Sequence, residues 1–182
     1  MSKIGVTVDT VLLAYQKQKL TVLLVERKNP PFQSQWALPG GFVEENELLL
    51  TAAGRELEEE TGIKDVQLLP VKMCDDPSRD PRGHTISMVF WGITLTPELA
   101  KAGSDAKHIG WWPLAGLPSL AFDHYQVICD AQIYLQTIYN LARPLLQVTN
   151  GMTVTQLQKM LHGFCSRTAE VKKSRSNKKS QN

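Results

Sequence analysis

The octet RELEEETG, residues 55–62, concentrates four glutamates near the end of a predicted helix and so limits how the chain can fold. Strong helix formers run from residue 46 to residue 61, Asn46 is a good N-cap residue, and Gly62 suits the left-handed position that ends many helices. With about 100° per residue, an i, i+4 apolar stripe runs along this helix, formed by Leu49, Ala53 and Leu57. We expect this stripe to face a core.

Three of the four glutamates, Glu56, Glu59 and Glu60, fall on one arc beside the apolar stripe, whereas Glu58 faces water on the opposite side. On an exposed helix, like charges cost only a few tenths of a kcal/mol per pair, and the arc would be a solvated surface. At the rim of a core, with ~5 Å between carboxylates and an effective dielectric near ~20, each pair repels by roughly 3 kcal/mol. Such a cluster needs a counter-cation, and hard oxygen ligands suit Mg²⁺ or Mn²⁺.

The residues before the octet decide between these two interpretations. Gly41 is followed by five residues, Glu47, seven residues and then the run from Arg55 to Ile63. This order matches, without a departure, the Nudix box G-x5-E-x7-R-E-U-x-E-E-x-G-U, in which U is a bulky apolar residue. The chain therefore resembles the Nudix hydrolases, which cleave a nucleoside diphosphate linked to another group by attack of water on a phosphorus.

The resemblance implies a divalent-metal site, occupied by Mg²⁺ or Mn²⁺, at this box. Glu56 and Glu60 would be the principal ligands, one helical turn apart. Glu59 would be a further ligand or a base acting through water, and the carbonyl of Gly40 would complete the set. The cations would bridge the pyrophosphate oxygens, lower the pKa of the attacking water and neutralise charge in the transition state.

Four other box residues would support this site. Gly41 lets the backbone turn close to the metal, where a side chain would intrude, and Gly62 ends the helix. Glu47 would support the metal ligands without binding the metal itself. Arg55 would orient the glutamates without touching the phosphate, although an ordinary i, i+4 salt bridge explains it equally well.

The rest of the chain predicts strands around two long helices. Residues 6–15 and 20–27 are β-rich runs separated by the polar QKQK, which predicts a hairpin, and further strands are expected at 66–73, 84–95 and 107–112. A second helix is expected from Asp123, capped in a box-like arrangement with Gln126. Its apolar positions are Val127, Ile128, Ala131, Leu135, Ile138, Leu141 and Ala142. This order predicts the α/β class and an α/β/α sandwich, and the resemblance implies the same sandwich with a mixed β-sheet and a loop-helix-loop box.

With 182 residues, the chain has room for one ordinary domain and a small appendage. We expect a Nudix hydrolase domain at 1–145, a short helical extension at 146–165 and a disordered basic tail at 166–182. The tail holds six basic residues against Glu170, which leaves the preceding 165 residues mildly acidic despite the overall net charge of +2.

The sequence also indicates a compartment. No apolar run approaches the ~18 residues of a membrane span, and no signal peptide is visible after Met1. Cys74, Cys129 and Cys165 are scattered, which favours reduced thiols over a disulfide framework. We therefore expect a cytoplasmic protein without a membrane partner.

Three stretches outside the box resemble the branch that contains ADP-ribose pyrophosphatases and Nudix-related transcriptional regulators. They are PPFQSQWALPGGFV, RDPRGHTIS and SDAKHIGWWPLAGLPSLAFDH. Arg82 could meet a phosphate or ribose, or it could be a turn arginine paired with Asp80. Phe32 and Trp36 could stack on an adenine, or they could belong to the core.

The remaining candidates follow the long strand. Asp105 and Glu98 are alternatives for a distal carboxylate base. His124 is a candidate substrate contact, beside the capping residue Asp123.

These observations leave three functions open. The first is a metal-dependent pyrophosphohydrolase that converts ADP-ribose to AMP and ribose 5-phosphate. The second is an ADP-ribose-sensing transcriptional regulator, because residues 152–164 resemble the first helix of a winged helix-turn-helix domain. The residues after 164 are too few for the recognition helix and wing of such a DNA-binding domain. We therefore expect a nucleotide as partner and no nucleic acid. The third is a housekeeping Nudix hydrolase of broad specificity. A homodimer fits the resemblance, and the oligomeric state stays open.

Overall fold

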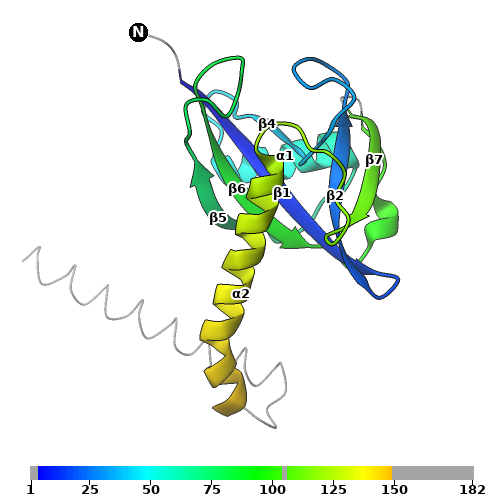
Figure 1. The fold of residues 1–182 in the computed structure, drawn as a ribbon, viewed down its shortest axis with the longest axis vertical. Coiled ribbons are helices and arrows are strands. Elements are labelled where there is room, and N and C mark those ends of the chain that lie inside the picture. Colours follow the sequence, from blue (N-terminus) through cyan, green and yellow to red (C-terminus); the bar gives the residue numbers. More distant parts are fainter. Residues whose placement is uncertain (1–3, 104–105, 149–182) are drawn as a thin grey trace, which may run out of the picture. The chain divides into compact units, whose positions relative to one another are not determined.

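A computed structural model describes residues 4–103 and 106–148, with side chains as far as residue 140 except at residue 139. The centre of the fold is a seven-stranded mixed sheet, in the order β3-β2-β1-β6-β5, with β4 paired to β1 and β7 paired to β2 (Figure 1). The strands are β1 (Gly5–Gln16), β2 (Lys19–Arg27), β3 (Trp36–Ala37), β4 (Gly40–Phe42), β5 (Leu69–Cys74), β6 (Thr85–Ile93) and β7 (Ala106–Pro113). The helices are α1 (Leu49–Thr61), the 3-10 helix η1 (Pro97–Leu99) and α2 (His124–Val148).

Strand β1 is the hub of the sheet. It pairs antiparallel with β2 through a tight turn in which Lys17 and Gln18 have φ of 47° and 62°, as a two-residue hairpin requires. It also pairs antiparallel with β4 and parallel with β6. The predicted hairpin is confirmed, and the sheet is mixed as expected.

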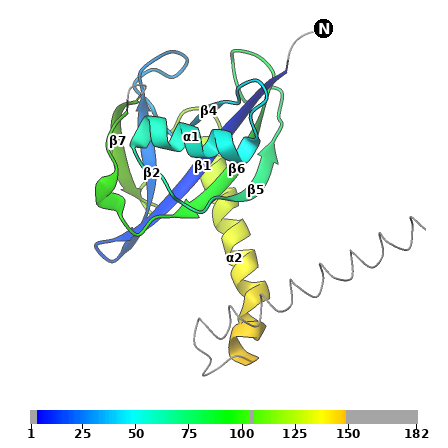
Figure 2. The same ribbon diagram turned by 180° about the vertical axis from the view of Figure 1, so that it is seen from behind.

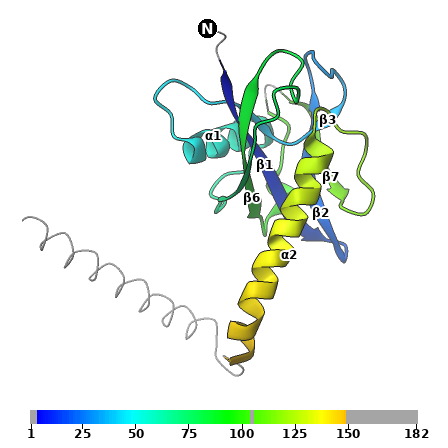
Figure 3. The same cartoon turned by 60° about the vertical axis from the view of Figure 1, so that its left-hand side comes forward.

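Each face of the sheet is covered by one helix, as the predicted sandwich requires. Figure 2 shows α1 lying across one face, and Figure 3 shows α1 and the start of α2 on opposite sides. Alternate residues of β1 and β2 point to the two faces. The buried cluster beneath α1 contains Val8, Leu12, Leu23, Ala52, Ala53, Leu57, Ile63, Leu68 and Phe90. The cluster beneath α2 contains Val11, Leu13, Val22, Leu24, Leu38, Cys74, Val89, Val127, Ile128 and Ala131.

The first helix differs from expectation at its N-terminus. Asn46 adopts a left-handed conformation, with φ of 63°, in the turn before the helix, so α1 begins only at Leu49 and has no side-chain cap. Leu49 is 39% exposed, and the apolar face of α1 is formed by Ala52, Ala53 and Leu57. The predicted cap and the burial of Leu49 are therefore wrong.

The C-terminus of α1 is closed as expected and is then fastened by a distant loop. Gly62 is left-handed, with φ of 69°, and its N–H donates to the carbonyl of Glu58 at 2.8 Å. The amides of Lys101 and Gly103 donate to the carbonyls of Thr61 at 2.8 Å and Glu60 at 2.9 Å. These bonds satisfy carbonyls that a helix end otherwise leaves to water.

The second helix begins next to the predicted residue, but its expected capping box is wrong. Both carboxylate oxygens of Asp123 accept hydrogen bonds from Arg79, and the side chain of Gln126 donates to Asp130 instead. Val127, Ile128 and Ala131 are buried as predicted. The side chains of Leu141 and Ala142 lie outside the described residues.

Two compact units divide the chain, one ending at Leu135 and the other beginning at Gln136. The sheet, α1 and the first part of α2 belong to the first unit. The first three residues of the expected extension, 146–148, end α2, and residues 149–182 lie outside the described residues, so the predicted boundaries stay predictions. No described helix is long and apolar enough to span a membrane.

Two glycines near the glutamates allow a test of this packing. A Cβ on Gly54, inside α1, would meet nothing within 4 Å, so Gly54→Ala should stabilise the fold by about 0.5–1 kcal/mol. A Cβ on Gly103 would lie 1.7 Å from the carbonyl oxygen of Glu59, so Gly103→Ala should destabilise it by about 1–3 kcal/mol. Urea unfolding of both variants measures the two changes. Equal changes would contradict the close approach of Gly103 to α1.

Candidate active site

The guanidinium of Arg55 gathers three carboxylates at one point of α1. Its Nε and Nη2 donate to the two oxygens of Glu47, both at 2.9 Å, and its Nη1 donates to Glu56 at 2.9 Å and Glu59 at 3.2 Å. Nη2 also donates to the carbonyl of Phe42 at 3.1 Å. These bonds lower the pKa of Glu47 to about 2 and raise the pKa of Arg55. The i, i+4 bond to Glu59 is confirmed as one part of a larger cluster, and the role of Arg55 in orienting metal ligands stays a prediction.

Glu56 lies in the most sheltered part of this cluster. Its side chain is only 15% exposed, and burial raises its pKa despite the bond from Arg55. A Cβ on Gly41 would lie 2.4 Å from Glu56 Oε1, so the carboxylate would have to move away if residue 41 carried a side chain. Cation binding at this position would be favourable, since it would offset the cost of keeping a sheltered carboxylate charged.

Glu60 lies one helical turn after Glu56 and contacts the same Gly40–Gly41 turn. Its Oε2 accepts a hydrogen bond from the N–H of Gly40 at 3.0 Å, and a Cβ on Gly40 would lie 2.1 Å from the carbonyl oxygen of Val8. Glu58 lies elsewhere, half-exposed and 3.6 Å from Nζ of Lys64. The predicted separation of Glu58 from the other three glutamates is confirmed.

The donor set fits a hard divalent cation by its chemistry. Glu56, Glu59, Glu60 and the Gly40 backbone supply oxygens of the kind that Mg²⁺ and Mn²⁺ take. In the part of the chain that the structure describes, however, no three acidic, histidine or cysteine side chains converge as a ready-made cation site. The carboxylates are held by Arg55 and by the Gly40 amide, so a bound cation would replace some of these hydrogen bonds.

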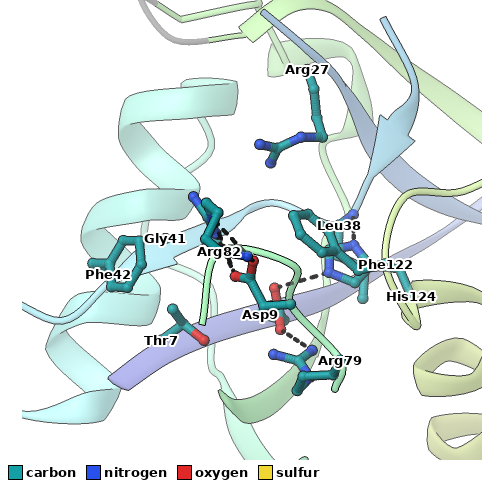
Figure 4. A pocket seen from close by; sticks show the side chains of 12 residues that line it. Thr7, Asp9, Arg27, Leu38, Gly41, Phe42, Arg79, Arg82, Phe122 and His124 are labelled. Carbon is teal, nitrogen blue, oxygen red and sulfur yellow. Dashed lines mark hydrogen bonds and ion pairs between the residues drawn. The ribbon is translucent and has the colours of Figure 1, made fainter. Parts of the chain in front are cut away.

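A cavity of about 90 Å³ adjoins the Gly40–Gly41 turn on the side of β1 that faces α2 (Figure 4). Its walls come from β1, the end of β2, the β4 turn, the loop before β6 and the start of α2. It is lined by Thr7, Asp9, Arg27, Leu38, Gly40, Gly41, Phe42, Arg79, Asp80, Arg82, Phe122 and His124. Of the four predicted substrate contacts, Arg82 and His124 line this cavity.

The predicted pairing of Arg82 with Asp80 is confirmed, and its contact with a phosphate or ribose stays a prediction. It is paired with the buried Asp80, with 2.7 Å between Nη2 and Oδ2, yet 43% of its side chain is exposed. Its guanidinium lies over the rings of Phe42 and Phe122, 5.2 Å and 5.7 Å from their centres. Arg27 also lies over Phe122, at 4.8 Å. Two guanidiniums are thus arranged around one aromatic ring of the cavity.

Buried charges in the wall of the cavity form a network that the sequence did not reveal. Arg79 has only 6% of its side chain exposed and pairs with Asp123 at 2.7 Å and Asp9 at 3.3 Å. Asp9 also accepts a hydrogen bond from Ser87 at 2.5 Å. A lone aspartate within the apolar run of β1 was the available signal. Its partners are 70 or more positions away, so only the folded chain identifies them.

His124 joins this network. It is 4% exposed; its Nδ1 accepts a hydrogen bond from the N–H of Leu38 at 2.9 Å, and its Nε2 lies 3.4 Å from Asp9 Oδ1. Burial lowers the pKa of His124. Nδ1 is already occupied by the Leu38 N–H and Nε2 faces Asp9, and the expected direct contact of His124 with substrate stays a prediction.

The other two predicted aromatic contacts do not line the cavity. Trp36 packs beside the α2-facing core, with its ring 5.4 Å from that of Trp112. Phe32 packs edge-on against Phe122, at 4.7 Å. Of the two distal base candidates, Glu98 is exposed in η1 and Asp105 lies outside the described residues.

The Glu47–Arg55 pair predicts a pH dependence of stability. The pKa of Glu47 is about 2 in the folded protein against 4.5 for the ordinary group, so the unfolded chain binds the proton more readily. Its stabilising effect should be complete above pH 4.5 and disappear as the pH falls to about 2. The difference in unfolding free energy between wild type and Glu47→Gln, measured in urea, should therefore shrink across this window.

A double-mutant cycle isolates the pair. In an Arg55→Met background, the effect of Glu47→Gln should keep only the smaller part of its pH dependence, which comes from the hydrogen bond of the Glu44 N–H to Glu47 at 3.0 Å. An undiminished dependence there would show that Arg55 is not the main group that holds the carboxylate.

Comparisons with known proteins agree with this geometry. The family model of the NUDIX domain matches residues 3–131. The ADP-ribose pyrophosphatase of Methanocaldococcus jannaschii is 48% identical over 109 residues, which cover 60% of this chain and 64% of that protein. The ADPR responsive transcriptional repressor NtrR of Acinetobacter baylyi is 32% identical over 172 residues, 91% of this chain and 68% of the repressor.

A solved structure supports the fold. The NUDIX domain of Shewanella oneidensis NrtR, complexed with ADP ribose, superposes with a TM-score of 0.65 and 34% identity, over 74% of this chain and 90% of that domain. The matched residues contain the Arg55 hub, the Gly40–Gly41 turn and the adjoining cavity. By its sequence, its fold and the box that these residues form, the chain belongs to the NUDIX family.

Proposed function

We propose that this chain is a divalent-metal-dependent pyrophosphohydrolase that cleaves ADP-ribose to AMP and ribose 5-phosphate. One observation carries the proposal: the sheltered carboxylates of Glu56 and Glu60 meet the Gly40–Gly41 turn at the edge of an arginine-lined cavity. A diphosphate between the carboxylates and the arginines would have a cation site on one side and guanidiniums on the other. The name of the Methanocaldococcus jannaschii relative supports ADP-ribose as the substrate.

The metal-binding residues would be Glu56, Glu59, Glu60 and the carbonyl of Gly40. When bound, Mg²⁺ or Mn²⁺ supplies a water of lowered pKa and positive charge for the transition state. Glu59, whose side chain is 53% exposed, is the glutamate best placed to take a proton from a water that enters from solvent.

Arg55 and Glu47 would act on the glutamates and not on the substrate. The bidentate bond to Glu47 fixes the guanidinium, and the remaining donors hold Glu56 and Glu59. Loss of either partner would free the carboxylates to repel one another. Catalysis would then suffer through the orientation of the ligands.

Arg82 would bind the substrate from the opposite wall. A planar guanidinium that is half-exposed and braced by Asp80 can donate to phosphate or ribose oxygens without a costly loss of side-chain freedom. Stacking of the base on Phe32 or Trp36 remains a proposal, because both rings pack against other aromatic side chains. A cytoplasmic location remains a proposal too, supported by the free thiols of Cys74 and Cys129.

A regulator is the second candidate function. It is favoured by the length over which the chain matches the Acinetobacter baylyi repressor, 91% of its residues. The intact box favours hydrolysis, and the segment expected to resemble a DNA-binding helix lies outside the described residues. A gel shift on DNA from the chain's own upstream region, which survives physiological salt and responds to ADP-ribose, would establish regulation.

A substrate panel tests the reaction and the substrate separately. We expect turnover of ADP-ribose with Mg²⁺ or Mn²⁺, measured as phosphate released by a coupled phosphatase, with a higher kcat/KM than NADH, diadenosine polyphosphates or nucleoside triphosphates. A nucleoside triphosphate as best substrate would overturn only the substrate. A flat profile would indicate a broad housekeeping hydrolase, and no turnover of any member would refute the pyrophosphohydrolase.

Two glutamates on the same helix provide a matched pair of variants. Glu60→Gln keeps the shape and can still accept the Gly40 N–H, but it removes a ligand charge, so most turnover should be lost. Glu58→Gln, on the other side of α1, should leave turnover nearly unchanged. Equal losses would mean that the acidic run is a solvated surface.

The same variants should differ in their thermal response to metal. A ligand at a hundredfold excess over its Kd stabilises a native state by about 2.7 kcal/mol. Mn²⁺ at millimolar concentration should raise the melting temperature of wild type and Glu58→Gln, and ADP-ribose should increase the rise. The shift should be much smaller in Glu60→Gln, as differential scanning fluorimetry with EDTA controls would show.

A further inference from the structure

The turn that carries Gly40 is held at three successive residues by three different elements. The amide of Leu38 donates to Nδ1 of His124 at 2.9 Å, and the carbonyl of Pro39 accepts from the amide of Thr10 at 2.8 Å. The amide of Gly40 donates to Glu60 at 3.0 Å. Of these three bonds, the one from His124 comes from outside both the sheet and the box, because His124 is the first residue of α2.

The bonds to His124 fix which ring nitrogen carries the proton. An amide N–H can only donate, so Nδ1 must be unprotonated and Nε2 must carry the hydrogen of the neutral ring. Nε2 then faces Asp9 Oδ1 at 3.4 Å (Figure 4). Asp9 is itself held by Ser87 at 2.5 Å and by Arg79 at 3.3 Å. The imidazole is therefore oriented at both ends.

This placement separates His124 from the reaction. The residue is 4% exposed, and both nitrogens are engaged with the protein. Its hydrogen bond to Leu38 acts two residues before the glycine whose carbonyl is a proposed metal ligand. A histidine that merely filled the core would need no acceptor directed at that amide.

We propose that His124 is a positioning residue that fixes the Leu38–Gly41 turn, and with it the Gly40 carbonyl, for cation binding. This inference rests on the proposed metal-dependent function. Asp9, Ser87 and Arg79 keep the imidazole in place. The hydrogen bond between His124 and the Leu38 amide then fixes the position of the turn. The start of α2 thereby becomes part of the support of the catalytic box.

Two isosteric variants separate the two ends of the ring. In His124→Asn, the amide oxygen takes the place of Nδ1 and can accept from Leu38, while the contact with Asp9 is lost. In His124→Gln, the amide lies near the place of Nε2 and faces Asp9, so the Leu38 amide loses its acceptor. Residues that orient metal ligands from behind typically change metal affinity or activity by about 10- to 100-fold when replaced.

We expect His124→Gln to raise the Mn²⁺ concentration for half-maximal activity by about tenfold or more, with little change in KM for ADP-ribose at saturating metal. His124→Asn should stay close to wild type. The rise in melting temperature on adding Mn²⁺ alone, relative to EDTA, should follow the same order. Equal metal responses of the two variants would overturn the proposal, even if both were less stable than wild type.

Hydrogen exchange of the Leu38 amide reports the bond directly. In ¹⁵N-leucine-labelled protein, this amide should exchange slowly in wild type and His124→Asn and faster in His124→Gln. Slow exchange in all three would overturn the role of His124.

The exchange and Mn²⁺ readouts also separate this proposal from the enzyme function. If wild type hydrolyses nothing, the function fails while these readouts still test the positioning role. If wild type hydrolyses ADP-ribose and the variants respond alike to metal, only the positioning role fails.

Discussion

The repulsion among carboxylates at the end of α1 is the constraint around which the rest of the structure is organised. The C-terminal end of a helix carries partial negative charge, so acidic residues in its last turns are placed against the helix dipole. Arg55 offsets this cost by binding Glu47, Glu56 and Glu59 at once. The amides of Lys101 and Gly103 cover the terminal carbonyls of α1 and place donors where the dipole is negative.

The two faces of the sheet determine where the carboxylates of α1 contact the Gly40–Gly41 segment and the cavity. One face of β1 packs on α1, and the other face lines the cavity with Thr7 and Asp9. The β4 turn runs past β1 and brings Gly40 and Gly41 between the glutamates and the cavity. A single strand thus supports both the anionic side and the arginine-lined side of the site. Its burial on both faces is what makes that support rigid.

Local signals predicted the hairpin, the Gly62 terminus, the box helix and the separation of Glu58, because each depends on residues close together in sequence. The start of α1 was not predictable in this way: the left-handed turn at Asn46 depends on how the loop from β4 packs. The buried network was hidden for a related reason, since Asp9 meets Arg79, Ser87 and His124 only after three segments far apart in the chain have assembled. His124 looked like a substrate contact because a histidine next to a helix start gives no sign of burial.

The close fit at Gly41 has a consequence for how the two sides of the site respond to substitution. A single added methyl group there would meet Glu56 at 2.4 Å, while the arginine-lined wall across the cavity would remain as it is. A Gly41→Ala substitution would therefore require the Glu56 carboxylate to move, while Arg27, Arg79 and Arg82 would keep their places. The proposed cation site and the arginine-lined wall are thus held by different parts of the fold, and a single substitution can disturb one of them while the other stays in place.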